Sequence, residues 1–194
     1  MPATKKPKKQ AVRIIGGQWK RSVLPVLEAP GLRPTPDRVR ETLFNWLYTL
    51  RGGMQGARCL DLCAGTGALG FEAASRGAGA VLMIEQNRAL VAQLQAIKTK
   101  LNAAVVQVQA GDALSQLSLL NGPFDCVFVD PPYDAKLLPR ILPLLASRLA
   151  PQALVYVEDH APLAFADWQV LRKDRAGQVH YGLLQCAKGA EISG

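Results

Sequence analysis

From Arg58 onward the sequence alternates between short apolar runs and longer segments with helical periodicity. The apolar runs predict strands near 58–62, 80–85, 105–110, 125–130 and 153–158, and the intervening segments predict helices near 68–77, 87–101, 114–120 and 136–149. This alternation is typical of an α/β fold whose mostly parallel sheet is joined by right-handed crossovers. After Trp168 the segments 169–173 and 179–187 flank a turn at Ala176-Gly177, which predicts an antiparallel hairpin closing one edge of the sheet.

The chain divides by composition into three parts. Residues 1–11 are expected to form a disordered basic tail, 12–53 an extension that carries a hairpin and a helix, and 54–190 the main α/β domain. The hairpin is expected to turn at Gly16-Gly17, because glycine supplies the positive φ of tight turns. The helix is expected to start with Thr35 as its N-cap and to end at Gly52-Gly53.

Basic residues are concentrated in the N-terminal part. The net charge is +8, and residues 1–21 contain seven lysines and arginines but no acid. Such a basic segment indicates contact with a polyanion. The expected RNA contacts are Arg13, Trp19, Lys20, Arg21 and, in the following linker, Arg33. A solubilising tail and ordinary surface charges on the hairpin are the alternatives.

Other composition features exclude several classes of protein. No apolar run is long enough to span a membrane, and no apolar segment follows the first lysines as in a secretory signal. The four cysteines form no CxxC pair and lie far from both histidines, so neither a zinc site nor disulfides are expected. A cytoplasmic protein without a membrane partner is the prediction.

A glycine-rich segment follows the first expected strand of the main domain. Gly65, Gly67 and Gly70 fit the pattern G-x-G-x-x-G, which alone is compatible with a dinucleotide cofactor. Four consecutive strands, however, end at or near an acid, namely Asp61, Glu85, Asp112 and Asp130. Such an acidic rim would repel a pyrophosphate but suits a cationic sulfonium, an amino group, ribose hydroxyls and an adenine amine. These are the groups of S-adenosylmethionine.

The apolar run Cys126 to Val129 is stopped by Asp130-Pro131-Pro132-Tyr133. Proline cannot donate to a sheet ladder, so Asp130 is expected at the carboxyl end of a central strand, where open α/β sheets bind ligands. A carboxylate, a free backbone carbonyl and an aromatic ring together suit a planar group that bears an exocyclic amine. These four residues are the candidate catalytic set.

These motifs together resemble class I S-adenosylmethionine-dependent methyltransferases that act on exocyclic amines. Three further segments resemble the RsmD family more closely: RIIGGQW at 13–19, RPTPDRVRETLF at 33–44, and GQV at 177–179. The resemblance covers about residues 12–187. It implies a Rossmann-like fold with a seven-stranded, mostly parallel sheet, a C-terminal antiparallel hairpin, and an N-terminal β-hairpin and helix extension.

The resemblance also implies an activity and a set of roles. Members of this family are bacterial enzymes that methylate N2 of one guanine in 16S rRNA, so the expected partner is that RNA, free or within an assembled or assembling small subunit. A monomer that needs no metal is expected. Cofactor contacts are implied for Asp61, Ala64, Gly65, Thr66, Gly67, Glu85, Gln86, Asp112, Ala113 and Arg38.

Three other functions are compatible with parts of the pattern. A DNA or RNA adenine or cytosine amino-methyltransferase would share the Asp130 to Tyr133 motif, although no separate DNA-reading domain is evident. A nicotinamide oxidoreductase would share the glycine loop but not the acidic rim. A non-catalytic rRNA-binding assembly factor would share the fold, but its strand ends would have no need of four acids.

Overall fold

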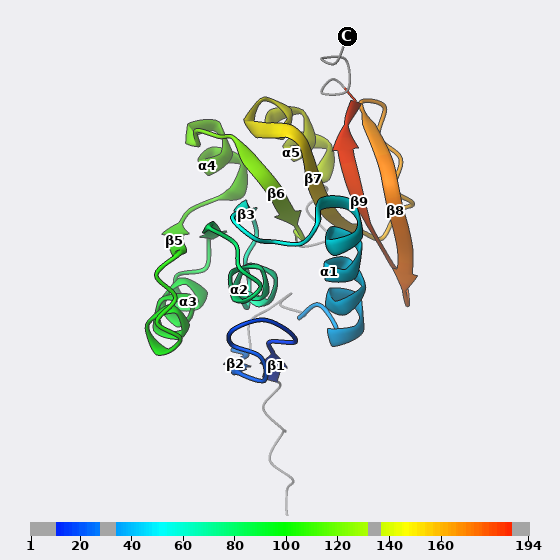
Figure 1. Ribbon diagram of the computed structural model, residues 1–194. Helices are drawn as coiled ribbons and strands as arrows, with labels where there is room; N and C mark the ends of the chain where they lie inside the picture. The colour runs from blue at the N-terminus through cyan, green and yellow to red at the C-terminus, as the bar shows by residue number, and fades with distance from the viewer. Residues whose placement is uncertain (1–10, 28–33, 132–136, 188–194) are drawn as a thin grey trace, which may run out of the picture.

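A seven-stranded sheet forms the centre of the protein in its computed structural model, which describes residues 11–27, 34–131 and 137–187 (Figure 1). The strand order is β5-β4-β3-β6-β7-β9-β8, and β9 runs in the direction opposite to the other six strands. The strands are β3 (Arg58–Asp61), β4 (Ala80–Glu85), β5 (Val106–Ala110), β6 (Phe124–Val129), β7 (Leu149–Asp159), β8 (Trp168–Ala176) and β9 (Val179–Cys186). The predicted mostly parallel sheet with a C-terminal hairpin is therefore confirmed.

Helices cover both faces of this sheet. The helices α1 (Asp37–Arg51), α2 (Ala68–Ser75) and α3 (Arg88–Lys100) contribute to one hydrophobic core. The helices α4 (Ala113–Leu119) and α5 (Leu138–Leu145), which a 3-10 turn over Ala146–Arg148 extends, contribute to a second core on the other face. The central strand β6 is buried between the two, which explains its continuous apolar run. None of the described helices is long and apolar enough to cross a membrane.

The N-terminal extension pairs β1 (Ala11–Arg13) antiparallel with β2 (Val23–Pro25), as the sequence predicts. The expected tight turn at Gly16-Gly17 is wrong, because the strands are joined by a wide loop that packs on the end of α2. Gln18 N donates to Ser75 O at 2.7 Å, and Gly17 adopts a φ of 77° there. A Cβ atom at Gly17 would lie 1.8 Å from the Ser75 carbonyl oxygen, so the glycine serves close packing rather than a hairpin turn.

The start of α1 also differs from the prediction. Pro36 occupies the N-cap position, no side chain caps the helix, and the expected Thr35 cap is wrong. The Thr35 hydroxyl instead donates to Asp130 Oδ2 at 3.3 Å. The C-terminal end is confirmed, because Gly52 adopts the left-handed conformation with a φ of 83°.

A fully buried ion pair holds the extension against the sheet domain. Arg40 of α1 donates from Nη1 to Glu72 Oε2 of α2 at 3.4 Å, and from Nη2 to the Arg13 carbonyl at 2.9 Å. Glu72 accepts the backbone N–H groups of Ile15 and Gly16 at 2.7 and 2.8 Å. Each partner thus satisfies groups from the extension that would otherwise be buried without hydrogen bonds.

Replacing Glu72 with alanine should strongly destabilise the protein. The change removes one of the two carboxylates paired with the buried Arg40 guanidinium, the other being Asp37 at 2.6 Å, and leaves the backbone N–H groups of Ile15 and Gly16 unsatisfied. We expect the free energy of unfolding to fall by about 3–5 kcal/mol in urea denaturation. Glu41→Ala, an exposed position on the same helix as Arg40, is the matched control and should change it by less than about 0.5 kcal/mol. Equal stability of both variants would contradict this role.

Candidate active site

Acidic side chains gather where the parallel strands end. Asp61 closes β3 and Glu85 closes β4, Asp112 follows β5, and Asp130 follows β6. The structure therefore brings together the four acids that the sequence pointed to. It adds Glu158, near the end of β7, which was not among the predicted site residues. Because Val129 and Val157 are partners in register, Asp130 and Glu158 lie on adjacent strands at the same level.

The glycine loop crosses this rim between β3 and α2. Asp61 Oδ2 accepts the Gly70 N–H at 2.9 Å, which fixes the first turn of α2 over the strand end. Gly65 and Gly67 have φ angles of 52° and 76°. A Cβ atom at Gly67 would lie 2.5 Å from a methyl carbon of Leu94, so the loop needs glycine at this position both for space and for conformation.

Glu85 is held in one orientation by the backbone of two loops. Its Oε2 accepts the Gly65 N–H at 2.9 Å, and its Oε1 accepts the Asn87 N–H at 2.8 Å. The Asn87 side chain in turn caps α3 by accepting the Ala89 N–H at 2.9 Å. Glu85 is thus a buried carboxylate fixed beside the glycine loop, whereas the neighbouring Gln86 is exposed.

Asp112 is an exposed carboxylate with a structural task of its own. Its Oδ1 accepts both the backbone N–H and the hydroxyl of Ser115 at 2.9 Å, which caps α4. These hydrogen bonds lower the pKa of Asp112 below its usual range. Ala113, the first residue of α4, is buried behind it.

Burial and mutual repulsion raise the pKa of two rim carboxyls. The pKa of Asp61 rises to about 7, mainly because the group is buried, with a smaller contribution from Glu85 and an opposing one from the Gly70 hydrogen bond. The pKa of Asp130 rises well above its usual value through burial of its carboxyl and through the charge of Glu158, against which the Thr35 hydrogen bond acts.

The rim carries negative charge without basic neighbours. Within 11–27, 34–131 and 137–187 no lysine or arginine lies within salt-bridge distance of Asp61, Glu85 or Asp130. Carboxylates placed in this way favour a cationic ligand, because its charge would relieve the repulsion among them.

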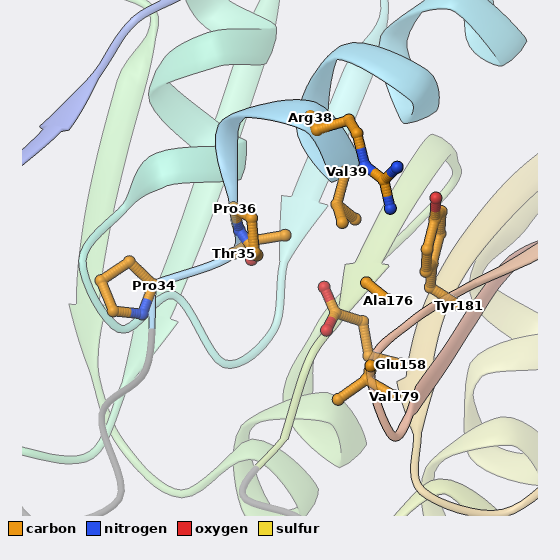
Figure 2. A pocket seen from close by; sticks show the side chains of 10 residues that line it. Pro34, Thr35, Pro36, Arg38, Val39, Glu158, Ala176, Val179 and Tyr181 are labelled. Atoms are coloured by element: carbon orange, nitrogen blue, oxygen red, sulfur yellow. The ribbon is translucent and has the colours of Figure 1, made fainter.

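A pocket of about 260 Å³ lies beside this rim, at the end of β7 (Figure 2). One wall comes from the segment before and at the start of α1, and consists of Pro34, Thr35, Pro36, Arg38 and Val39. The other wall comes from the β8–β9 hairpin and consists of Ala176, Gly177, Val179 and Tyr181, with Glu158 between the two walls. Figure 2 shows the Arg38 guanidinium beside Tyr181, so this expected cofactor residue lines the pocket.

The expected RNA-binding residues differ in how they are placed. Arg13, Lys20 and Arg21 are exposed on the extension, as a contact surface requires. Trp19 is half-buried against the core, and its backbone N–H donates to Ser75 Oγ at 2.9 Å, so it anchors the loop. The expected residues Arg33, Pro132 and Tyr133, like the tail 1–10, lie outside the described residues.

The sequence did contain a signal for Glu158. The rule that selected the other four acids, a carboxylate at the end of a parallel strand, applies equally to the strand expected at 153–158. The pocket itself had no local signal, because its walls are more than a hundred residues apart in the chain.

Known proteins similar to this chain agree with its architecture. The family model described as "Conserved hypothetical protein 95" matches residues 12–185. "Ribosomal RNA small subunit methyltransferase D" of Escherichia coli K12 is 46% identical over 180 residues, covering 90% of this chain and 89% of that protein. The protein of the same name from Haemophilus influenzae is 40% identical over 189 residues, covering 91% of this chain and 95% of that protein. A solved structure described as "Putative methyltransferase yhhF from Escherichia coli" superposes with a TM-score of 0.81 at 46% identity, covering 91% of this chain and 98% of that one.

Neutralising Asp61 should stabilise the protein at alkaline pH. A folded-state pKa raised to about 7 means that the folded protein retains this proton more tightly than the unfolded chain, so stability is lost as pH rises through 7. Asp61→Asn removes that loss and can still accept the Gly70 N–H. We expect the melting temperature at pH 8 to rise by about 2–4 °C or more, with the gain disappearing toward pH 4.

Asp112→Asn is the matched control, because the pKa of Asp112 is lowered rather than raised. It should show no gain at pH 8. If Asp61→Asn changed the melting temperature equally at pH 4 and pH 8, the raised pKa of Asp61 could not be the cause of the change.

Proposed function

Because the chain belongs to the RsmD family of class I methyltransferases, we infer that it is a methyltransferase acting on ribosomal RNA of the small subunit. We propose further that S-adenosylmethionine is the methyl donor and that N2 of a guanine in 16S rRNA is the acceptor. The observation that carries the proposal is the Asp130 carboxylate at the carboxyl end of the buried strand β6, inside an acidic rim beside a glycine loop.

The described residues fit this cofactor. Bound S-adenosylmethionine supplies an electrophilic methyl group on a positively charged sulfur. In the proposal Asp61 faces its methionine end, Glu85 binds the ribose hydroxyls, and Asp112 holds the adenine amine with help from the Ala113 N–H. Gln86 adjoins Glu85, and Ala64, Gly65, Thr66 and Gly67 form the loop that passes beneath. The support is the group of strand-end carboxyls, of which Asp61, Glu85 and Asp130 have no lysine or arginine within salt-bridge distance among the described residues, and the fixed orientation of Glu85.

Asp130 is proposed to activate the acceptor amine. The N2 lone pair of guanine is delocalised into the ring, which makes it a poor nucleophile. Hydrogen bonds donated by N2–H to Asp130 and to the Pro131 carbonyl would localise this lone pair and aim it at the methyl carbon. As the N–C bond forms, the bond between that methyl carbon and sulfur would break and leave S-adenosylhomocysteine, and Asp130 would take the N2 proton that is lost. Good alignment can supply about 7–11 kcal/mol of the rate acceleration.

Neighbouring residues complete the proposed arrangement. The Thr35 hydroxyl fixes one oxygen of Asp130, and in this proposal the other oxygen accepts from the amine. Pro132 would stiffen the turn, and Tyr133 would stack on the base, which is typically worth about 1–3 kcal/mol. These last two roles are predictions from the sequence.

No observation favours the alternative functions. The acidic rim opposes a nicotinamide dinucleotide, whose pyrophosphate it would repel. A non-catalytic RNA-binding factor would gain nothing from gathering buried carboxyls with raised pKa values, such as Asp61 and Asp130, at one end of its sheet. The relatives from Escherichia coli and Haemophilus influenzae carry names that refer to ribosomal RNA, which argues against DNA as the substrate.

We propose that the exposed residues Arg13, Lys20 and Arg21 of the extension contact RNA phosphates. The extension is fixed to α2 through Glu72, so these cations are presented by a rigid element. Phosphate contacts would orient the substrate without reading its sequence.

Asp130→Ala should abolish methyl transfer while leaving cofactor binding intact. Loss of the carboxylate removes the acceptor for the N2 proton, so we expect the rate of methyl incorporation to fall by about 100-fold or more. Asp125→Ala is the matched control, because it changes the same residue type at the opposite end of β6. Calorimetry with S-adenosylmethionine should give similar affinities for both variants, and a parental rate in Asp130→Ala would refute the assignment.

Removing the two adjacent charges of the extension should weaken RNA binding in a salt-dependent manner. For the double variant Lys20→Gln, Arg21→Gln we expect the slope of log affinity against log salt to become shallower by about 1.4–1.8, because each phosphate contact contributes about 0.7–0.9. The double variant Lys98→Gln, Lys100→Gln on α3 is the control. An unchanged slope would exclude Lys20 and Arg21 from the contact surface.

A further inference from the structure

The pocket at the end of β7 has the size and walls to hold one heterocyclic base. Its volume of about 260 Å³ lies just below the range of roughly 300–1,000 Å³ typical of ligand pockets. Pro34, Pro36 and Val39 line one side, and Ala176 and Val179 line the other (Figure 2). Apolar walls of this kind suit the faces of a planar ring, because a ring buries two apolar faces and keeps its polar groups on its edge.

Among the described residues that line this pocket, one carboxylate, that of Glu158, is fixed inside it. Glu158 is 4% exposed, and Figure 2 shows its carboxylate pointing into the space between Thr35 and Tyr181. Tyr156, two residues earlier on the same face of β7, donates its hydroxyl to Glu158 Oε1 at 2.7 Å. This hydrogen bond orients the carboxylate, which is an acceptor and would therefore match an N–H group on the edge of a bound ring.

The pocket also adjoins the proposed catalytic carboxylate. Asp130 and Glu158 follow residues that are paired in register on β6 and β7, so they lie at the same end of the sheet, and their carboxyls are close enough for the charge of Glu158 to raise the pKa of Asp130. Thr35 lines the pocket and donates its hydroxyl to Asp130 at 3.3 Å. A ring that enters this pocket therefore meets two neighbouring acceptors.

Guanine is the base whose edge matches two adjacent acceptors. Its Watson–Crick edge carries N1–H next to the N2 amine, both of which are donors. Adenine and cytosine also carry an amine, but the neighbouring ring nitrogen of each is an acceptor and would face a carboxylate without a proton between them. We propose that Glu158 is a specificity residue that accepts the guanine N1–H while Asp130 accepts N2–H. This inference rests on the proposed function and gives a physical reason for its choice of base.

The base 2-aminopurine separates the two hydrogen bonds, because it keeps the 2-amino group but has an unprotonated N1. The methylated guanine is first located by mass spectrometry after reaction of the parental protein with small subunits that lack the modification. Subunits are then reconstituted on 16S rRNA with guanine or 2-aminopurine at that position. We expect the parental protein to prefer guanine in kcat/KM by about 10- to 100-fold.

Glu158→Gln should remove most of this preference. Its amide can donate to the unprotonated N1 of 2-aminopurine, so the ratio of kcat/KM values should fall by about 10-fold or more. Comparing the ratio with that of the parental protein cancels the different intrinsic reactivities of the two amines. Glu41→Gln, which is exposed on α1, should keep the parental ratio. Tyr156→Phe removes the hydrogen bond that orients the Glu158 carboxylate, so it should also lower the ratio of kcat/KM values. This second variant tests the inference if Glu158→Gln does not fold.

Each result is decisive. Equal use of both bases by the parental protein, or a parental ratio in both Glu158→Gln and Tyr156→Phe, would overturn the role of Glu158 while leaving the proposed function intact. Failure of the parental protein to methylate any guanine would overturn the proposed function itself, and this inference with it.

Discussion

The buried pair of Arg40 and Glu72 is the interaction on which the rest of the arrangement depends. It joins α1 and α2 to the N-terminal loop, because Arg40 also binds the Arg13 carbonyl and Glu72 also accepts two backbone N–H groups of the loop. Arg40 Nε also donates to the Thr35 carbonyl at 3.3 Å, which connects this pair to the residue that holds Asp130. One ion pair thus fixes the extension, the wall of the pocket and the position of a proposed catalytic side chain.

The acidic rim sets a second constraint, because folding places carboxylates close together away from water. Holding these groups ionised costs free energy, and the raised pKa values of Asp61 and Asp130 reflect that cost. A cationic ligand bound at the rim would offset it, so ligand binding and stability are expected to be linked. In this account the protein gives up some stability at neutral pH in order to hold a site already prepared for positive charge.

Much of the fold and of the candidate site could be predicted from the sequence. The features that could not be predicted have one physical cause in common, which is contact between residues far apart in the chain. The parallel sheet, the glycine loop and the acids at Asp61, Glu85, Asp112 and Asp130 follow from local patterns, because the end of each strand is marked by residues that adjoin its apolar run in the sequence. Thr35 was misassigned as a helix cap, since its partner Asp130 lies 95 residues away. The Arg40–Glu72 pair spans 32 residues and the Gly16–Glu72 contact spans 56, so no local pattern could reveal either. Glu158 could have been found by the strand-end rule, whereas its pocket could not, because a hairpin that follows it in the chain forms one wall.

The most direct test of the central claim identifies the methylated nucleoside itself. Small ribosomal subunits from a strain that lacks this protein would be incubated with the purified protein and S-adenosylmethionine carrying an isotopically labelled methyl group. Their 16S rRNA would then be digested to nucleosides and analysed by mass spectrometry. The account predicts a single labelled product, N2-methylguanosine, at one position. Label in methylated adenosine or cytidine, or no label at all, would contradict it.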